Sequence, residues 1–67
     1  MTTKNYEYNG YLIEIDEHPI YHDFQFVIKT INGKEIKATN TYLYENEYDA
    51  EMAAQLTINN LQNGKDN

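Results

Sequence analysis

The chain has 67 residues, no cysteine and a net charge of −6, from eleven carboxylates against five lysines. This length holds one domain, residues 1–67, in which we expect residues 63–67 to be a frayed tail. The composition excludes disulfides and thiolate metal sites, and the few cations argue against direct nucleic-acid binding.

The first strand signal, residues 6–15, changes parity in the middle. Large side chains stand on even positions before the dipeptide Asn9-Gly10 and on odd positions after it. A strand alternates faces with a period of two, so something at this dipeptide must shift the register. The two alternatives are a hairpin turn and a β-bulge at Gly10, and we favour the bulge because the strand before a turn would be very short. The bulge would turn five large side chains inward: Tyr6, Tyr8, Tyr11, Ile13 and Ile15.

Two further strand-like runs, residues 22–30 and 34–44, surround the turn signal Asn32-Gly33. A two-residue turn would set the apolar residues of the first run beside polar residues of the second. A three-residue loop over residues 31–33, closed by a G1 bulge, aligns the apolar faces instead. This register pairs Thr30 with Lys34, Ile28 with Ile36, Phe26 with Ala38 and Phe24 with Asn40, and sets Lys29 opposite Glu35. The predicted inward residues are Phe24, Phe26, Ile28, Ile36 and Ala38, followed by Tyr42 with Tyr44 at the rim.

Residues 46–62 have the pattern of a helix. Asn46 is a favourable N-cap, Asp49 stands at N3, and Gly64 is a plausible stop. Helical spacing defines a buried stripe of Ala50, Ala53, Ala54, Thr57, Ile58 and Leu61. The order strand, strand, strand, helix predicts an α+β fold, in which a three-stranded antiparallel meander carries one C-terminal helix on one face.

The sequence offers little for catalysis. Serine and cysteine are absent and the three glycines are isolated, so we predict no catalytic residue, no cofactor and no enzyme activity. His18 and His22 stand four residues apart, which on a helix would place both on one face. Pro19 lies between them in a segment that connects two strands, so we assign no metal ligand and keep weak metal binding at this loop as an alternative.

The surface residues point to a protein partner. Seven tyrosines and several outward-facing apolar residues favour an interface with another protein or with a second copy. The candidate interface residues are Leu12, Val27, Leu43, Tyr21, Tyr48, Met52 and Leu56. The candidate acidic patch, which could mimic phosphates if the partner binds nucleic acid, is Glu45, Glu47, Asp49 and Glu51.

We therefore predict a small acidic binding protein that acts without catalysis. Frequent asparagine and the absence of arginine are typical of AT-rich genomes such as those of phages, which suggests a stoichiometric inhibitor of a host or defence protein. The alternative is a structural homodimer. No signal peptide and no membrane span are recognisable, so we expect a cytoplasmic protein.

The segment FQFVIKTINGKEIKATNTY, residues 24–42, resembles the core hairpin of small bacterial and phage domains of the YegP-like type. Its Phe-x-Phe-Val strand, Asn-Gly turn and following Lys/Glu-hydrophobic strand carry the resemblance. The resemblance implies three strands and a helix, and it implies no particular activity or functional residue.

Overall fold

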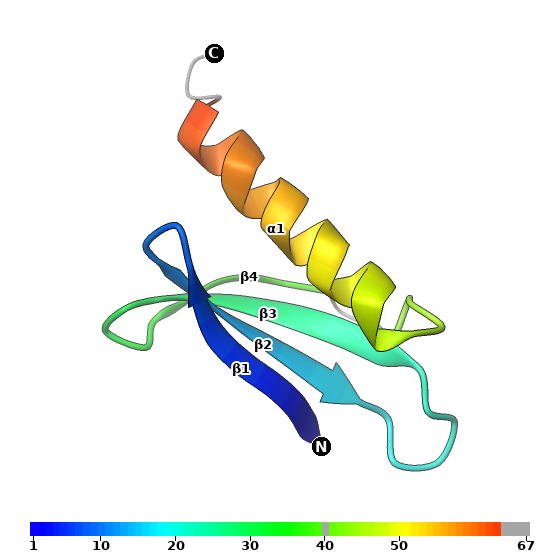
Figure 1. Ribbon diagram of the computed structural model, residues 1–67. Helices are drawn as coiled ribbons and strands as arrows, with labels where there is room; N and C mark the ends of the chain where they lie inside the picture. The colour runs from blue at the N-terminus through cyan, green and yellow to red at the C-terminus, as the bar shows by residue number, and fades with distance from the viewer. Residues whose placement is uncertain (40, 64–67) are drawn as a thin grey trace.

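The computed structural model describes residues 1–39 and 41–63. It is an antiparallel sheet in the order β1-β2-β3-β4, with α1 packed across one face (Figure 1). The elements are β1 Thr2–Tyr8, β2 Tyr11–Glu17, β3 Phe24–Thr30, β4 Glu35–Ala38 and α1 Glu47–Asn63. The predicted α+β fold with one C-terminal helix is confirmed, but the sheet has four strands and not three. Of the predicted tail over residues 63–67, Asn63 is the last residue of α1, whereas residues 64–67, with the predicted stop at Gly64, lie outside the described residues.

The extra strand arises at Asn9-Gly10, where the predicted bulge is wrong. Asn9 has φ 49° and Gly10 has φ 88°, the pair of positive angles that a two-residue type I′ turn requires. Tyr8 therefore pairs with Tyr11, and Tyr6 pairs with Ile13. A two-residue loop joins even positions of β1 to odd positions of β2, so the predicted inner face is correct although its cause is different. The strand before the turn is not too short, as the prediction assumes, because residues 2–5 extend β1.

The β3–β4 hairpin begins in the predicted register. The backbone N–H of Thr30 donates to the carbonyl of Lys34 at 2.8 Å, and Gly33 has φ 93°, as the three-residue loop requires. Lys29 lies opposite Glu35 as predicted. The register then shifts by one residue, so that Ile28 pairs with Lys37.

That shift makes several predicted contacts wrong. Ile36 is the extra residue of the bulge and remains 42% exposed instead of entering the core. Ala38 pairs with Val27 rather than with Phe26. The predicted pairing of Phe24 with Asn40 falls on a residue outside the described part of the chain.

The predicted strand over residues 34–44 contains only the short β4, which ends at Ala38, and a single bridge at Tyr44. Phe24 and Tyr44 form an isolated bridge with backbone N···O distances of 2.7 and 3.1 Å. The Tyr44 ring stacks on Phe26, with ring centroids 6.3 Å apart. Tyr42, predicted to face the core, instead donates a hydrogen bond from its hydroxyl to Asp16. The inward roles of the two tyrosines are thus exchanged.

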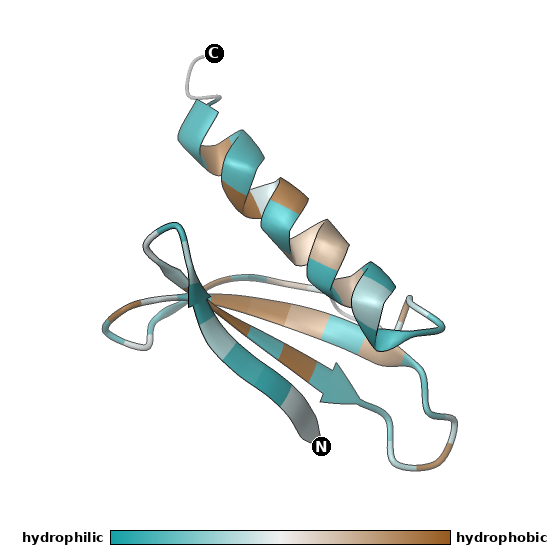
Figure 2. Ribbon diagram, in the orientation of Figure 1, coloured by the Kyte–Doolittle hydropathy of each residue, from teal (hydrophilic) through white to brown (hydrophobic). Residues whose placement is uncertain are grey.

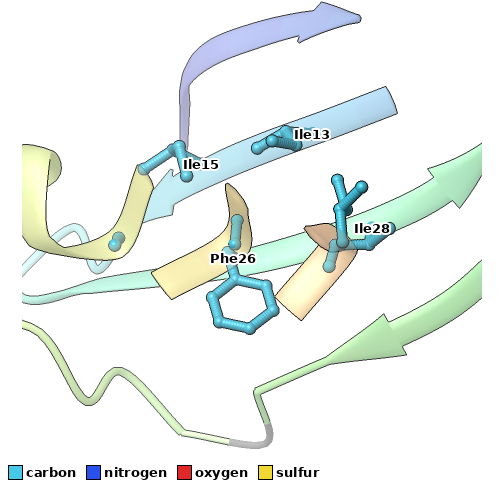
Figure 3. Packing of buried hydrophobic residues seen from close by; sticks show 7 residues of the cluster. Ile13, Ile15, Phe26 and Ile28 are labelled. Carbon is cyan, nitrogen blue, oxygen red and sulfur yellow. The ribbon is translucent and has the colours of Figure 1, made fainter. Parts of the chain in front are cut away.

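The core lies between α1 and the two central strands. Figure 3 shows the labelled side chains of β2 and β3 gathered on the face that α1 covers. The buried cluster is Ile13, Ile15, Phe26, Ile28, Ala50, Ala54 and Ile58. Alanines in the first half of the helix let it approach the sheet closely, and each large side chain contributes about 1.5–3 kcal/mol of hydrophobic stabilisation. Leu61, predicted in the buried stripe, is 45% exposed near the end of α1.

The start of α1 follows the predicted capping pattern. Asn46 Oδ1 accepts a hydrogen bond from the backbone N–H of Asp49 at 2.9 Å, and Asn46 Nδ2 donates to Asp49 Oδ2 at 3.0 Å. These contacts satisfy a backbone donor that the first helical turn leaves unpaired. No helix in the described residues is long and apolar enough to span a membrane.

Candidate functional site

Helix α1 carries apolar side chains on two opposite sides. The buried side consists of Ala50, Ala54 and Ile58, and two residues before each of them stand Tyr48, Met52 and Leu56. Helical residues two apart point about 160° away from each other, so the second set faces solvent. We call these three residues the outer stripe. Their exposed fractions are 65% for Tyr48, 38% for Met52 and 60% for Leu56. Figure 2 shows hydrophobic (brown) and hydrophilic (teal) bands alternating along α1.

The candidate acidic residues separate into two groups. Glu45 and Asp49 are exposed and Glu47 is half-buried at the start of α1, where carboxylates also complement the helix dipole. Glu51 is different, because its side chain is only 13% exposed and binds Lys4 Nζ at 2.7 Å. This hydrogen bond to Glu51 raises the pKa of Lys4. Glu51 therefore links α1 to β1 through an ion pair and is not part of the exposed acidic surface.

Tyrosine hydroxyls continue this attachment along β1. Tyr6 donates to Glu51 Oε1 at 3.1 Å and accepts from Gln55 Nε2 at 2.9 Å. Burial, opposed by the Gln55 contact, raises the pKa of Tyr6. Further along, Tyr8 donates to Asn59 Oδ1 at 3.3 Å. The side of α1 that faces β1 is thus occupied by intramolecular contacts, whereas the outer stripe is not.

The outer face of the sheet does not form the predicted apolar stripe. Leu12 lies opposite Lys29, and Val27 lies opposite Glu14. Lys29 Nζ binds Glu14 Oε2 at 2.8 Å, so an ion pair crosses between the two half-buried apolar residues. Leu43, the third predicted member, is 64% exposed in the segment after β4.

On the same face of the sheet, Asp16 is the shared partner of three polar groups. It accepts hydrogen bonds from Tyr42 at 3.1 Å and Gln25 at 3.4 Å, and it lies 3.0 Å from the amine of Met1. Burial alone would raise the pKa of Asp16, but the contacts with the Met1 amine and Tyr42 outweigh it and lower the pKa. The hydrogen bond to Asp16 raises the pKa of Tyr42. The carboxylate of Asp16 thus has polar partners within the protein.

Both histidines form hydrogen bonds to residues within five positions in the sequence. His18 Nδ1 accepts hydrogen bonds from the backbone N–H groups of Ile20 at 3.1 Å and Tyr21 at 3.3 Å. His22 Nδ1 lies 2.8 Å from Glu17 Oε2. Across residues 1–39 and 41–63, no cluster of three or more histidine, cysteine or acidic side chains could hold a metal ion. Tyr21 lies against the His18 ring and is 72% exposed.

Both edges of the sheet contain irregularities. The β1 register shifts between Thr2 and Lys4, and the β4 register shifts at Ile36. Bulges of this kind twist an edge away from regular pairing and protect it from adding another strand. The sheet edges are therefore less suited to association than the outer stripe.

The part of the chain that the structure describes encloses no pocket. Comparisons with known protein families, curated proteins and solved structures find no match. The resemblance of residues 24–42 to YegP-like domains stays a prediction. Sequence reasoning missed the attachment of Lys4 and Tyr6 to Glu51, because it depends on β1, which the predicted fold lacked.

Proposed function

We propose that this is a non-enzymatic binding protein that recognises another protein through the outer stripe of α1. The observation that carries this proposal is the alignment of Tyr48, Met52 and Leu56 on the side of the helix opposite the core. These side chains have no part in the buried cluster, and exposed apolar side chains that gather on one side of a protein often mark an interaction site. Tyrosine and methionine are also enriched at protein interfaces.

The other predicted interface residues support the proposal less. Leu12 and Val27 are separated by the ion pair of Lys29 with Glu14, and Tyr21 packs on His18. A stoichiometric inhibitor of a host or defence protein, acting in the cytoplasm, is one form that such binding would take. It needs a complementary surface and no catalytic group.

A homodimer is the second candidate, since antiparallel packing of two α1 helices is self-complementary. The carboxylates in the first turn of one helix, Glu47 and Asp49, would lie beside the last turn of the other, which contains no charged residue up to Asn63. Light scattering over a range of concentrations tests this candidate directly, because a mass that stays at 7.9 kDa would contradict it.

Photo-crosslinking tests the main proposal. One variant has the photoreactive residue benzoylphenylalanine in place of Tyr48, and a control variant has it in place of Tyr21, a tyrosine of similar exposure. The crosslinked products of the two variants are compared in cells of the organism that makes the protein. We expect a covalent adduct with a second protein from position 48 and none from position 21. Adding Leu56→Glu should remove the adduct while the circular dichroism spectrum is unchanged. No adduct from position 48, or equal adducts from both positions, would overturn the proposal.

A further inference from the structure

We infer that the partner of the outer stripe is a positively charged amphipathic helix. Its apolar side chains would pack on Tyr48, Met52 and Leu56, and its lysines or arginines would lie beside the carboxylates at the start of α1. This inference rests on the proposed function and adds the chemistry of the partner.

Charge is the first argument. The chain carries −6, and no lysine occurs within α1 from Glu47 to Asn63. Lys4 and Lys29 are already bound to carboxylates, at 2.7 and 2.8 Å. A cationic partner would therefore meet complementary charge at this surface, which speeds association and disfavours anionic competitors.

Lys34 lies at the opposite end of the sheet from the start of α1. Tyr44, just before α1, is bridged to Phe24 at the start of β3, whereas Lys34 is bonded to Thr30 at the end of β3. Lys37 lies between these ends, where it pairs with Ile28. The last turn of α1 lies near the β1–β2 turn, since Gln62 donates to the carbonyl of Asn9, so the acidic start of α1 is separated along the sheet from Lys34.

Shape is the second argument. The outer stripe is a row of residues four apart, about 12 Å long, which forms the kind of ridge that packs into the grooves of a second helix. An extended partner would pair with a sheet edge, and the shifts at Thr2/Lys4 and Ile36 make both edges irregular. A helix is therefore the matching secondary structure.

Like charge is the third argument, and it separates this partner from a second copy. A dimer through the outer stripe would bring together two chains that each carry −6. A longer basic helix can cover both the stripe and the neighbouring carboxylates.

Synthetic peptides test the inference. The probe is an 18-residue Leu/Lys peptide with an amphipathic helical pattern, and the controls are a scrambled peptide of equal composition and a Leu/Glu peptide of the same pattern. We expect the patterned Leu/Lys peptide to bind the full chain at least tenfold more tightly than the scrambled one. The Leu/Glu peptide should not bind. Fluorescence anisotropy at two salt concentrations measures each affinity.

Variants of the protein locate the binding site. The double variant Met52→Gln/Leu56→Gln should weaken binding of the patterned peptide at least tenfold. Ile31→Gln, which replaces an apolar residue of similar exposure on the β3–β4 loop, should leave it unchanged. Glu45→Gln should reduce the affinity several-fold and lessen its salt dependence.

Equal binding of the patterned and scrambled peptides, or unchanged binding by the double variant, would overturn the inference. Either result would mean that the peptide binds through unspecific charge attraction. If position 48 crosslinks to a protein through a segment that is not a basic helix, the proposed function stands and the inference fails. If position 48 gives no adduct, the proposed function fails, and the inference fails with it whatever the peptide affinities.

Discussion

Replacing Gly10 by L-alanine and by D-alanine tests the turn that creates β1. A Cβ at Gly10 would meet nothing within 4 Å, so the effect of the substitution comes from the backbone alone. At φ 88° an L-residue costs about 1–2 kcal/mol. For a domain of this size that loss lowers Tm by roughly 4–16 °C. D-alanine favours positive φ and restricts the unfolded chain, so it should stabilise by about 0.4–1 kcal/mol.

The assay is thermal unfolding followed by circular dichroism on chemically synthesised chains. Equal Tm values for L- and D-alanine at Gly10 would refute a positive φ there. The same pair of substitutions at Asn9 separates a two-residue turn from a bulge, because only the turn also places Asn9 at positive φ, here 49°. The lost contact of Asn9 with Asn59 is common to both variants and cancels in the comparison. Equal stability of the two variants at Asn9 would refute the turn.

Three further predictions concern the core, the attachment of α1 and the response to acid. Ile58→Ala should lower the free energy of unfolding by about 2–5 kcal/mol in urea titrations, since Ile58 is fully buried; a loss near zero would contradict its place in the core. Glu51→Gln should destabilise the fold through Lys4, and less so at high salt, which denaturation at two ionic strengths measures. Asp16 has a folded-state pKa below its ordinary 3.8, so its stabilisation is present above about pH 4 and is lost as pH falls through the folded pKa. Tyr42→Phe should therefore make acid unfolding less steep between pH 5 and 2, and an unaltered pH profile would show that the contact has no energetic effect.

The features that the sequence predicted correctly are set by local contacts. Asn46 caps the helix through a residue three positions away, and the alanine stripe follows from helical spacing alone. The three-residue loop and the pair of Lys29 with Glu35 also depend on neighbours close in sequence. The exposure of Tyr48 and Met52 follows from the same helical spacing.

The failures within the sheet involve the register of the strands. Nothing in the composition of β4 specifies that Ile36 leaves the ladder, because the unbulged register would pair it with the apolar Ile28. Once the register shifts, Ala38 changes its partner, and Tyr44 rather than Tyr42 reaches the core. At Gly10 the two explanations gave the same inner face, so hydrophobic pattern alone could not separate them.

The candidate site was predictable only where it depends on the helix. The outer stripe is visible as a spacing of four residues, but the removal of Glu51 from the acidic patch is not. Lys4 and Tyr6 reach Glu51 from β1, a strand that exists only because the chain turns at Asn9-Gly10. Tyr6 and Glu51 are 45 residues apart in the sequence. Such long-range pairs have no local signal in the sequence.

The residues of α1 that pack on the sheet are different from those of the outer stripe, and this separation has an evolutionary consequence. Ala50, Ala54 and Ile58 are constrained by the close approach of the helix to the sheet, whereas Tyr48 and Leu56 contribute nothing to the buried cluster. Substitutions on the outer side can therefore accumulate at little cost in stability. Descendants of this chain could exchange one target for another within a few mutational steps and still inherit an unchanged scaffold.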